Sequence, residues 1–185
     1  MTSIRTGLEG IHNDHQINDQ SRNRGFSPCF STVDSAHLQE PETKGDHMSQ
    51  ENKELVRRWF EALSRHDADS VADMVASDFV NNSSTNQGRD GVRAELDYWF
   101  GAFPDASASV EDLIADGDRV VARVTTSGTH GGEFMGSPAT GKRISVQEVD
   151  IFRIENGKIA EAWAAVDFFG MLTQLGLLPS EEPVG

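Results

Sequence analysis

The chain has 185 residues and carries 16 Lys and Arg against 30 Asp and Glu, a formal charge of −14. Proteins that bind nucleic acid or dock on anionic membranes present basic surfaces, so this balance argues against both kinds of partner. The single cysteine, Cys29, excludes an internal disulfide framework, and no apolar run of about 18 residues is present to span a membrane. No secretory signal is readable, so we expect a cytoplasmic protein with one domain.

Residues 1–47 differ in composition from the rest of the chain. They are rich in Ser, Asn, Asp, Gln, His and Gly, and their apolar residues follow neither a helical nor a strand period. Such a segment buries too little apolar surface to offset an ordering cost of about 1–2 kcal/mol per residue. We therefore predict a disordered tail over 1–47, a domain over 48–178 and a C-terminal tail over 179–185. Met48 as the true start of translation is an alternative that the sequence leaves open.

The first half of the domain has helical patterns. Residues 50–65 predict an amphipathic helix, because apolar residues recur at i, i+3, i+4 and i+7. The members of this stripe are Leu55, Val56, Trp59, Phe60 and Leu63. Asp69 is expected to cap a short second helix that runs through Val75. Asp90 is expected to cap a third helix over 91–103.

After residue 103 the apolar period changes from 3.6 to 2, which indicates strands. A brief strand is expected over 79–82, and longer strands over 107–115, 119–130, 143–155 and 158–168. Asn156-Gly157 is a strong signal for a type I′ hairpin turn. A short helix over 169–175 ends the domain. Helices followed by an antiparallel meander predict an α+β fold, with the helices on one face of a curved sheet.

The strand over 143–155 carries two carboxylates in the middle of its more apolar face, Glu148 and Asp150. The apolar pattern predicts that this face points inward, where acidic residues are rarely found without a partner or a function. At a spacing of about 7 Å and an effective dielectric constant near 20, the two charges repel by about 2.4 kcal/mol. Repulsion and desolvation both raise a carboxyl pKa, so one group could donate a proton near neutral pH while the other acts as a base.

The opposite orientation of this strand is the alternative interpretation. Apolar residues also occur on its other face, at Val149 and Ile151. With that face inward, the two carboxylates would lie in solvent or pair with arginines. The candidates for such pairs are Arg123, Arg143 and Arg153.

His130 ends a strand and has the parity of the strand's apolar residues. Two interpretations stay open, a functional histidine near a cavity mouth and a surface histidine at a strand end. A metal site made by His130, Glu148 and Asp150 is a weaker alternative, because no typical ligand spacing supports it. We therefore expect no metal.

Aromatic residues at helical spacing could form the floor of an apolar pocket. Trp59, Trp99 and Phe103 are the candidates, although such residues more often belong to a core. Asn81 is either a pocket hydrogen-bonding group or a turn residue.

Three stretches of the domain resemble SnoaL-like polyketide cyclases, also called ester cyclases, of the nuclear-transport-factor-two-like superfamily. They are NKELVRRWFEAL, AFPDASASVEDLIADGDRVVARVTTSGTHGGEFMGSPATGKRI, and VQEVDIFRIENGKIAEAW followed by LTQLG. The resemblance covers Asn52–Gly176 and none of the tail. It implies a cone-shaped curved antiparallel sheet with the N-terminal helices on its concave face, a cavity between them, no cofactor and frequent oligomers.

The resemblance also bears on the site residues. The family's aspartate on the last strand, an acid/base for aldol closure, aligns with Ala164, so that part of the mechanism does not carry over. A Gln and a His at two other pocket positions of the family align with Glu148 and Asp150. This alignment agrees with an acidic pair that faces the cavity.

Two functional hypotheses follow for the domain. The first is a cofactor-independent enzyme that cyclises, isomerises or dehydrates an apolar carbonyl-bearing substrate, with Asp150 as base, Glu148 as acid and His130 orienting the substrate. Its pocket residues would be Trp59, Asn81, Trp99, Phe103, Met135 and Ala164. The alternative is a non-catalytic module that binds a hydrophobic ligand or dimerises. Under both hypotheses the expected partners are a small apolar molecule and a second copy of the chain.

Overall fold

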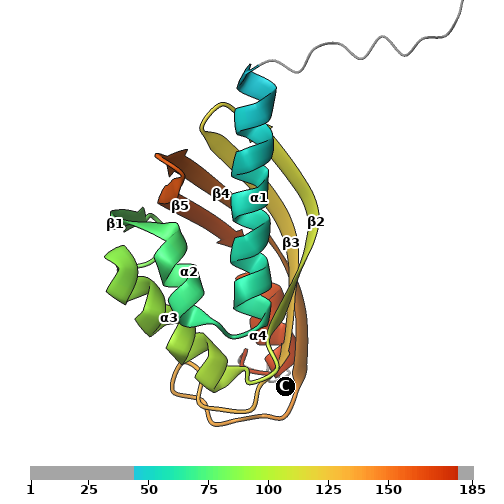
Figure 1. The fold of residues 1–185 in the computed structure, drawn as a ribbon. Coiled ribbons are helices and arrows are strands. Elements are labelled where there is room, and N and C mark those ends of the chain that lie inside the picture. The colour runs from blue at the N-terminus through green and yellow to red at the C-terminus, as the bar shows by residue number, and fades with distance from the viewer. Residues whose placement is uncertain (1–43, 179–185) are drawn as a thin grey trace, which may run out of the picture. The chain divides into compact units, whose positions relative to one another are not determined.

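The structure is a computed structural model that describes residues 44–178 (Figure 1). Within this range the helices are α1 (Lys44–Ser64), α2 (Ala68–Met74), α3 (Gly88–Ala102) and α4 (Phe168–Leu175). The strands are β1 (Val75–Asn81), β2 (Ser107–Asp116), β3 (Arg119–Thr129), β4 (Arg143–Glu155) and β5 (Lys158–Val166). The predicted α+β class is confirmed.

The five strands form one mixed sheet in the order β1-β5-β4-β3-β2. Strands β2 to β5 form the predicted antiparallel meander, and Asn156 and Gly157 both have positive φ, as a type I′ turn requires. The prediction of a wholly antiparallel sheet is wrong at one edge, because β1 runs parallel to β5. No hairpin links these two strands, so their relative direction is not dictated by a turn.

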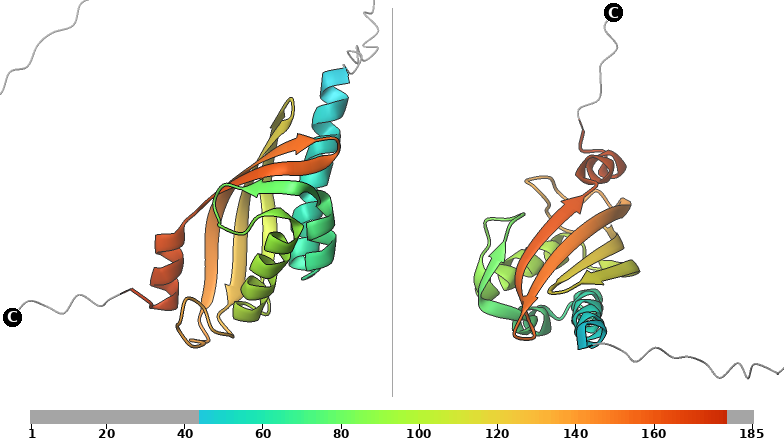
Figure 2. Two further views of the ribbon diagram at one scale, coloured as in Figure 1. Left: turned by 90° about the vertical axis from the view of Figure 1, so that its left-hand side faces the viewer. Right: turned by 90° about the horizontal axis from the view of Figure 1, so that it is seen from above.

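Helices α1, α2 and α3 lie on one face of the curved sheet, as predicted, whereas α4 lies beyond the end of β5 (Figure 2). The larger core cluster joins α1, α2 and α3 to the inward residues of the sheet, so that Phe60 of α1 shares it with Val120 of β3 and Phe152 of β4. A smaller cluster around Phe103 and Ile144 connects the end of α3 to α4. The inward residues of β3 and β4 have even numbers, which fixes the side of the sheet that carries the site.

Several helix boundaries differ from the predicted ones. Helix α1 begins at Lys44 rather than at Gln50, so residues 44–47 of the predicted 1–47 tail are helical instead of disordered. The rest of that tail and the predicted tail over 179–185 lie outside the described residues. The cap of α2 is Asp67 rather than Asp69, because the Asp67 carboxylate accepts a hydrogen bond from the Ser70 N–H (3.0 Å).

The other end effects are smaller. Helix α3 begins at Gly88 after Gln87, which makes no side-chain cap, so Asp90 lies in the first turn instead of before it. Strand β5 ends at Val166 rather than at Phe168, because Asp167 accepts a hydrogen bond from the Gly170 N–H (2.8 Å) and starts α4. In the part of the chain that the structure describes, every helix is too short or too polar to cross a membrane.

Candidate functional site

A cavity of about 830 Å³ lies between α3 and the inward face of the sheet. Most of its wall is apolar and comes from Leu63, Leu96, Trp99, Phe134, Met135, Val146, Ala164, Val166, Phe168 and Met171. The polar part of its wall comes from Ser83, Ser84, Thr85, Asn86, Glu95, Tyr98, Thr126 and Glu148. This composition, a large apolar surface with a few polar groups, is typical of a small-molecule site.

The acidic pair of β4 faces inward. Glu148 lines the cavity, and Asp150, one inward position further along the strand, is only 7% exposed. Val149 lies on the other face of the strand and is exposed. The orientation predicted from the apolar pattern is therefore confirmed.

The two carboxyl groups differ in their hydrogen bonds. The Thr126 hydroxyl donates a short hydrogen bond to Glu148 Oε1 (2.6 Å) from the neighbouring strand β3. Among residues 44–178, no group donates a hydrogen bond to the Asp150 carboxyl. A donor stabilises the charged form of a carboxyl group, so Glu148 is the better placed of the two to be ionised.

Burial raises the pKa of both groups, and for Glu148 the Thr126 hydrogen bond partly opposes that rise. Burial, together with the nearby Glu148 charge, raises the pKa of Asp150 to about 8. The pair therefore combines a protonated Asp150 with a more readily ionised Glu148 near neutral pH. Two carboxyl groups with unequal proton affinities can divide into a proton donor and a proton acceptor, which is what acid/base chemistry needs.

The arginines that could have neutralised the pair lie elsewhere. Arg143 pairs with Asp105 (3.8 Å), and Arg153 with Glu155 (3.0 Å) and Glu161 (2.7 Å). Arg123 has odd parity on β3 and is exposed. Within the described residues no cation forms an ion pair with either carboxylate, so the alternative of a solvated or arginine-paired site is wrong.

Small residues surround Asp150 across the sheet. Its cross-strand partners are Ala122 on β3 and Ala164 on β5. Ala164 lines the cavity, and its backbone N–H donates a hydrogen bond to Ser83 Oγ (2.6 Å). Directly paired residues have Cβ atoms about 4.5–5.5 Å apart, so Asp150 lies beside the position at which the resemblance expects an aspartate.

His130 is fully buried and does not line the cavity. The Thr140 N–H donates to its Nδ1 (3.2 Å), and its Nε2 has no hydrogen-bond partner in the described part of the chain. The ring packs against Phe103 and Phe134, at centroid distances of 5.6 and 6.2 Å. In the described chain, His130 and the two carboxylates do not converge into a possible metal site.

The predicted aromatic residues separate into wall and core. Trp99 lines the cavity, and Phe103 is buried behind it at a centroid distance of 4.3 Å. Trp59 packs edge-on against Phe152 (5.8 Å) as part of the larger core cluster, outside the cavity wall. Of the three candidates, only Trp99 is in a position to touch a ligand.

The loop from Gly131 to Gly141 forms one side of the cavity through Phe134 and Met135. The Met135 N–H donates to the Tyr98 hydroxyl of α3 (2.8 Å), and Met135 has a positive φ and is 59% exposed. Gly132 approaches the end of α3 so closely that a Cβ there would overlap the Gly101 carbonyl oxygen. The loop is thus held against α3.

Asn81 lies behind the cavity wall rather than in it. Its side-chain N–H donates to Glu95 Oε2 (3.2 Å), and its Oδ1 accepts from the Ser83 N–H (3.0 Å). The sequence interpretation missed Glu95, Tyr98 and Thr126, which line the cavity. Thr126 shares the inward parity of β3, and Glu95 is four residues before Trp99 on one helix face, so both had a readable signal.

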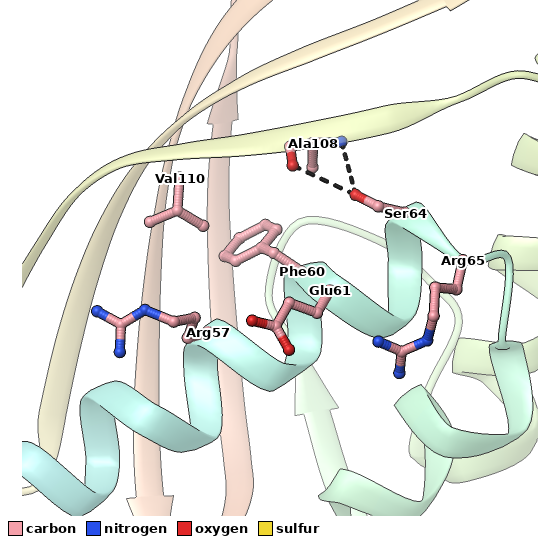
Figure 3. A pocket seen from close by; sticks show the side chains of 7 residues that line it. All are labelled: Arg57, Phe60, Glu61, Ser64, Arg65, Ala108 and Val110. Carbon is pink, nitrogen blue, oxygen red and sulfur yellow. Dashed lines mark hydrogen bonds between the residues drawn. The ribbon is translucent and has the colours of Figure 1, made fainter.

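A second hollow, of about 470 Å³, lies between α1 and the edge strand β2 (Figure 3). Phe60 and Val110 lie side by side in it, and the Ser64 hydroxyl accepts from the Ala108 N–H (2.9 Å) and donates to the Ala108 carbonyl (3.2 Å). Its charged residues are exposed: Arg57 and Glu61 on α1, and Arg65 directly after it. This groove offers no desolvated reactive group, so the cavity next to α3 is the better candidate.

Residues 53–175 match the family model described as SnoaL-like polyketide cyclase. The chain is 30% identical over 130 residues to aklanonic acid methyl ester cyclase DauD from Streptomyces sp. (strain C5), an alignment that covers 66% of this chain and 80% of that protein. It is 32% identical over 113 residues to nogalonic acid methyl ester cyclase from Streptomyces nogalater, covering 58% and 84% of the two chains. The solved structure of TsrD from Streptomyces laurentii is similar with a TM-score of 0.66 and 32% identity, covering 70% of this chain and 97% of that one.

Proposed function

Since the chain belongs to the SnoaL-like polyketide cyclase family, we propose that it cyclises an apolar, polyketide-derived carbonyl compound by acid/base catalysis without a cofactor. Two of its relatives are named as cyclases of polyketide methyl esters. A neutral ester also suits this cavity, whose charged lining residues, Glu95 and Glu148, are both acidic. A free carboxylate would meet repulsion there.

In the proposed reaction Glu148 is the base and Asp150 the acid. The Glu148 carboxylate takes a proton from a carbon next to a ligand carbonyl, and the resulting enolate attacks a second carbonyl carbon to form the new C–C bond. The oxygen of that second carbonyl takes up the proton of Asp150. A proton then returns from Glu148 to Asp150, two positions apart on one strand, and restores both groups without any oxidation or reduction.

One observation carries this proposal: a carboxylate with a dedicated hydrogen-bond donor lines an apolar cavity, beside a second carboxyl group that is buried on the same face of β4. Isomerisation or dehydration would use the same two proton positions, and we rank them after cyclisation.

The test is turnover of a polyketide methyl ester of the kind that the relatives' names specify, followed by mass spectrometry and chromatography of the product. Glu148→Gln and Asp150→Asn should each lower kcat by about 100-fold to 10,000-fold, the usual contribution of a positioned acid or base. Arg153→Gln, which alters a charged residue on the other face of β4, is the matched control and should retain activity. Full turnover by both carboxyl variants would remove the assignment.

A second candidate function is binding without catalysis, which the alanine at position 164 favours. Under that hypothesis a hydrophobic ligand co-purifies unchanged, and its affinity is indifferent to Asp150→Asn. Conversion of the ligand by the wild-type protein would exclude it.

We also propose a homodimer formed through the outer face of the sheet. Ile114 is 61% exposed there, and its row continues across the strands through Val121, Ile151 and Trp163. A row of apolar side chains on an outer sheet face suits a two-fold contact. Ile114→Lys should then shift the sedimentation coefficient to that of a monomer, and a wild-type protein that is already monomeric at micromolar concentration would contradict the proposal.

A further inference from the structure

The helix wall of the cavity carries a carboxylate of its own, Glu95 on α3. Glu95 shares its face of the helix with Tyr98 and Trp99, three and four residues later, and all three line the cavity. Glu148 lies on a different wall, on β4. A ligand between α3 and the sheet would therefore meet an acidic group on both sides.

Within residues 44–178, the Glu95 carboxylate is held by a hydrogen bond to only one of its two oxygens. Its Oε2 accepts a hydrogen bond from Asn81 Nδ2 (3.2 Å), and within the described residues its Oε1 has no hydrogen-bond or ion-pair partner. Asn81 is itself fixed by Gln87, whose Oε1 accepts from the Asn81 N–H (2.9 Å) and whose Nε2 donates to the Asn81 carbonyl (2.9 Å). This network orients the carboxylate before any ligand binds.

The cavity wall offers Glu95 no positive charge. Its lining residues include no Lys, Arg or His, and the Thr126 hydroxyl, its one threonine donor on the sheet, is engaged with Glu148. A hydrogen-bond acceptor that has fewer donors than it can accept is stabilised most by a donor on the ligand.

We propose that Glu95 determines specificity by accepting a hydrogen bond from a donor group of the ligand, either a hydroxyl or an ammonium. This inference rests on the proposed function only in using the same cavity. It adds a second recognition point, across the cavity from the reacting carboxyl pair. The selected ligands are thus apolar molecules that carry a hydrogen-bond donor on one edge and no negative charge.

The experiment measures binding, without turnover, of three matched probes: 2-methylanthraquinone, 2-(hydroxymethyl)anthraquinone and 2-(aminomethyl)anthraquinone. Quenching of tryptophan fluorescence reports occupancy, since Trp99 lines the cavity. The wild-type protein should bind the hydroxymethyl and aminomethyl probes about tenfold more tightly than the methyl probe, as expected for a hydrogen bond to a charged acceptor.

Variants separate the two donor chemistries. Glu95→Met should abolish both preferences, whereas Glu95→Gln, which keeps an acceptor oxygen without the charge, should lose the ammonium preference and keep part of the hydroxyl preference. Asp97→Asn, at an exposed position of the same helix, is the control and should retain both. Thermal melting checks that each variant is folded, and Glu95→Gln remains decisive for the ammonium preference if Glu95→Met does not fold.

Equal binding of the three probes to the wild-type protein, or a preference that survives Glu95→Met, would overturn the inference. Binding of none of them would show that the cavity is not the ligand site, and the proposed function would fall with it. A preference that depends on Glu95, together with full turnover by the Glu148 and Asp150 variants, would remove only the catalytic assignment.

Discussion

The cavity next to α3 and the groove next to α1 both lie between a helix and the same sheet. They differ in the surroundings of their charged side chains. In the groove, Arg57 and Glu61 of α1 and Arg65 directly after it are exposed, and the Ser64 hydroxyl connects the helix to β2 through two hydrogen bonds. In the cavity, carboxyl groups lie among apolar side chains and have no cation beside them.

The difference teaches where chemistry can occur in this fold. A charge on the exposed face of a helix is solvated by water and contributes little to stability. A buried carboxyl group beside an apolar wall instead has a raised pKa, as Asp150 does, and keeps its proton at higher pH than an exposed carboxyl group. Substitutions in the cavity next to α3 should therefore affect catalysis. Substitutions in the groove next to α1 should affect stability alone.

The largest effect on kcat should come from moving the carboxyl group from position 150 on β4 to position 164 on β5. Asp150→Ala should lower kcat by about 100-fold or more, and the double change Asp150→Ala with Ala164→Asp should recover about tenfold of that loss. The reason is register, because residues 150 and 164 are directly paired on β4 and β5. Steady-state kinetics on the two variants measures the recovery.

The control for this exchange is Ala165→Asp in the Asp150→Ala background. It adds the same charge on the opposite face of β5, so it should recover nothing. Equal recovery from positions 164 and 165 would show that register with Asp150 is irrelevant.

A second effect concerns stability and pH. The pKa of Asp150 rises from 3.8 to about 8 on folding, so between these values the unfolded chain has lost a proton that the folded protein keeps. The free energy of unfolding should therefore fall as pH rises from about 4 to about 8, by up to about 1.4 kcal/mol per pH unit from this group. Asp150→Asn should flatten that decline and stabilise the protein most at pH 8.

Denaturant unfolding at pH 5, 6, 7 and 8 tests this expectation. Asp97→Asn, at an exposed position, controls for the loss of one negative charge. Parallel pH profiles for the wild-type protein and Asp150→Asn would contradict the burial of a protonated carboxyl.

The smallest effect should come from a substitution in the groove next to α1. Ser64→Ala removes the hydroxyl that bonds both backbone groups of Ala108, so it should lower the free energy of unfolding by about 1 kcal/mol. It should leave kcat unchanged, because Ser64 does not line the cavity. A loss of turnover without a loss of stability would show that the groove takes part in the reaction.

Local patterns predicted most of this domain. Period-two alternation gave β4 its bounds and its inward face, and Asn156-Gly157 marked the turn, because parity and turn chemistry depend on neighbours in the chain. The pairing of β1 with β5 was not predictable in this way, since the two strands are far apart in sequence. The cap of α2 was misplaced because Asp67 and Asp69 are equivalent by residue type, and only the Ser70 hydrogen bond distinguishes them.

The candidate site was predicted where one strand determines it. Parity alone placed Glu148 and Asp150 on the cavity side, but their relative proton affinities depend on Thr126, which lies on another strand at a register that the sequence does not state. His130 shows the same limit. Its inward parity was readable, but the aromatic packing that separates it from the cavity was not.

Gly132 does not line the cavity, but its lack of a side chain limits the width of the cavity. The backbone N–H groups of Gly131 and Gly132 both donate to the Ala102 carbonyl (2.9 and 3.1 Å), and no side chain fits between Gly132 and Gly101. Any larger residue at position 132 would lift the loop, with Phe134 and Met135, away from α3. Relatives that carry a bulkier residue there should therefore have a wider cavity.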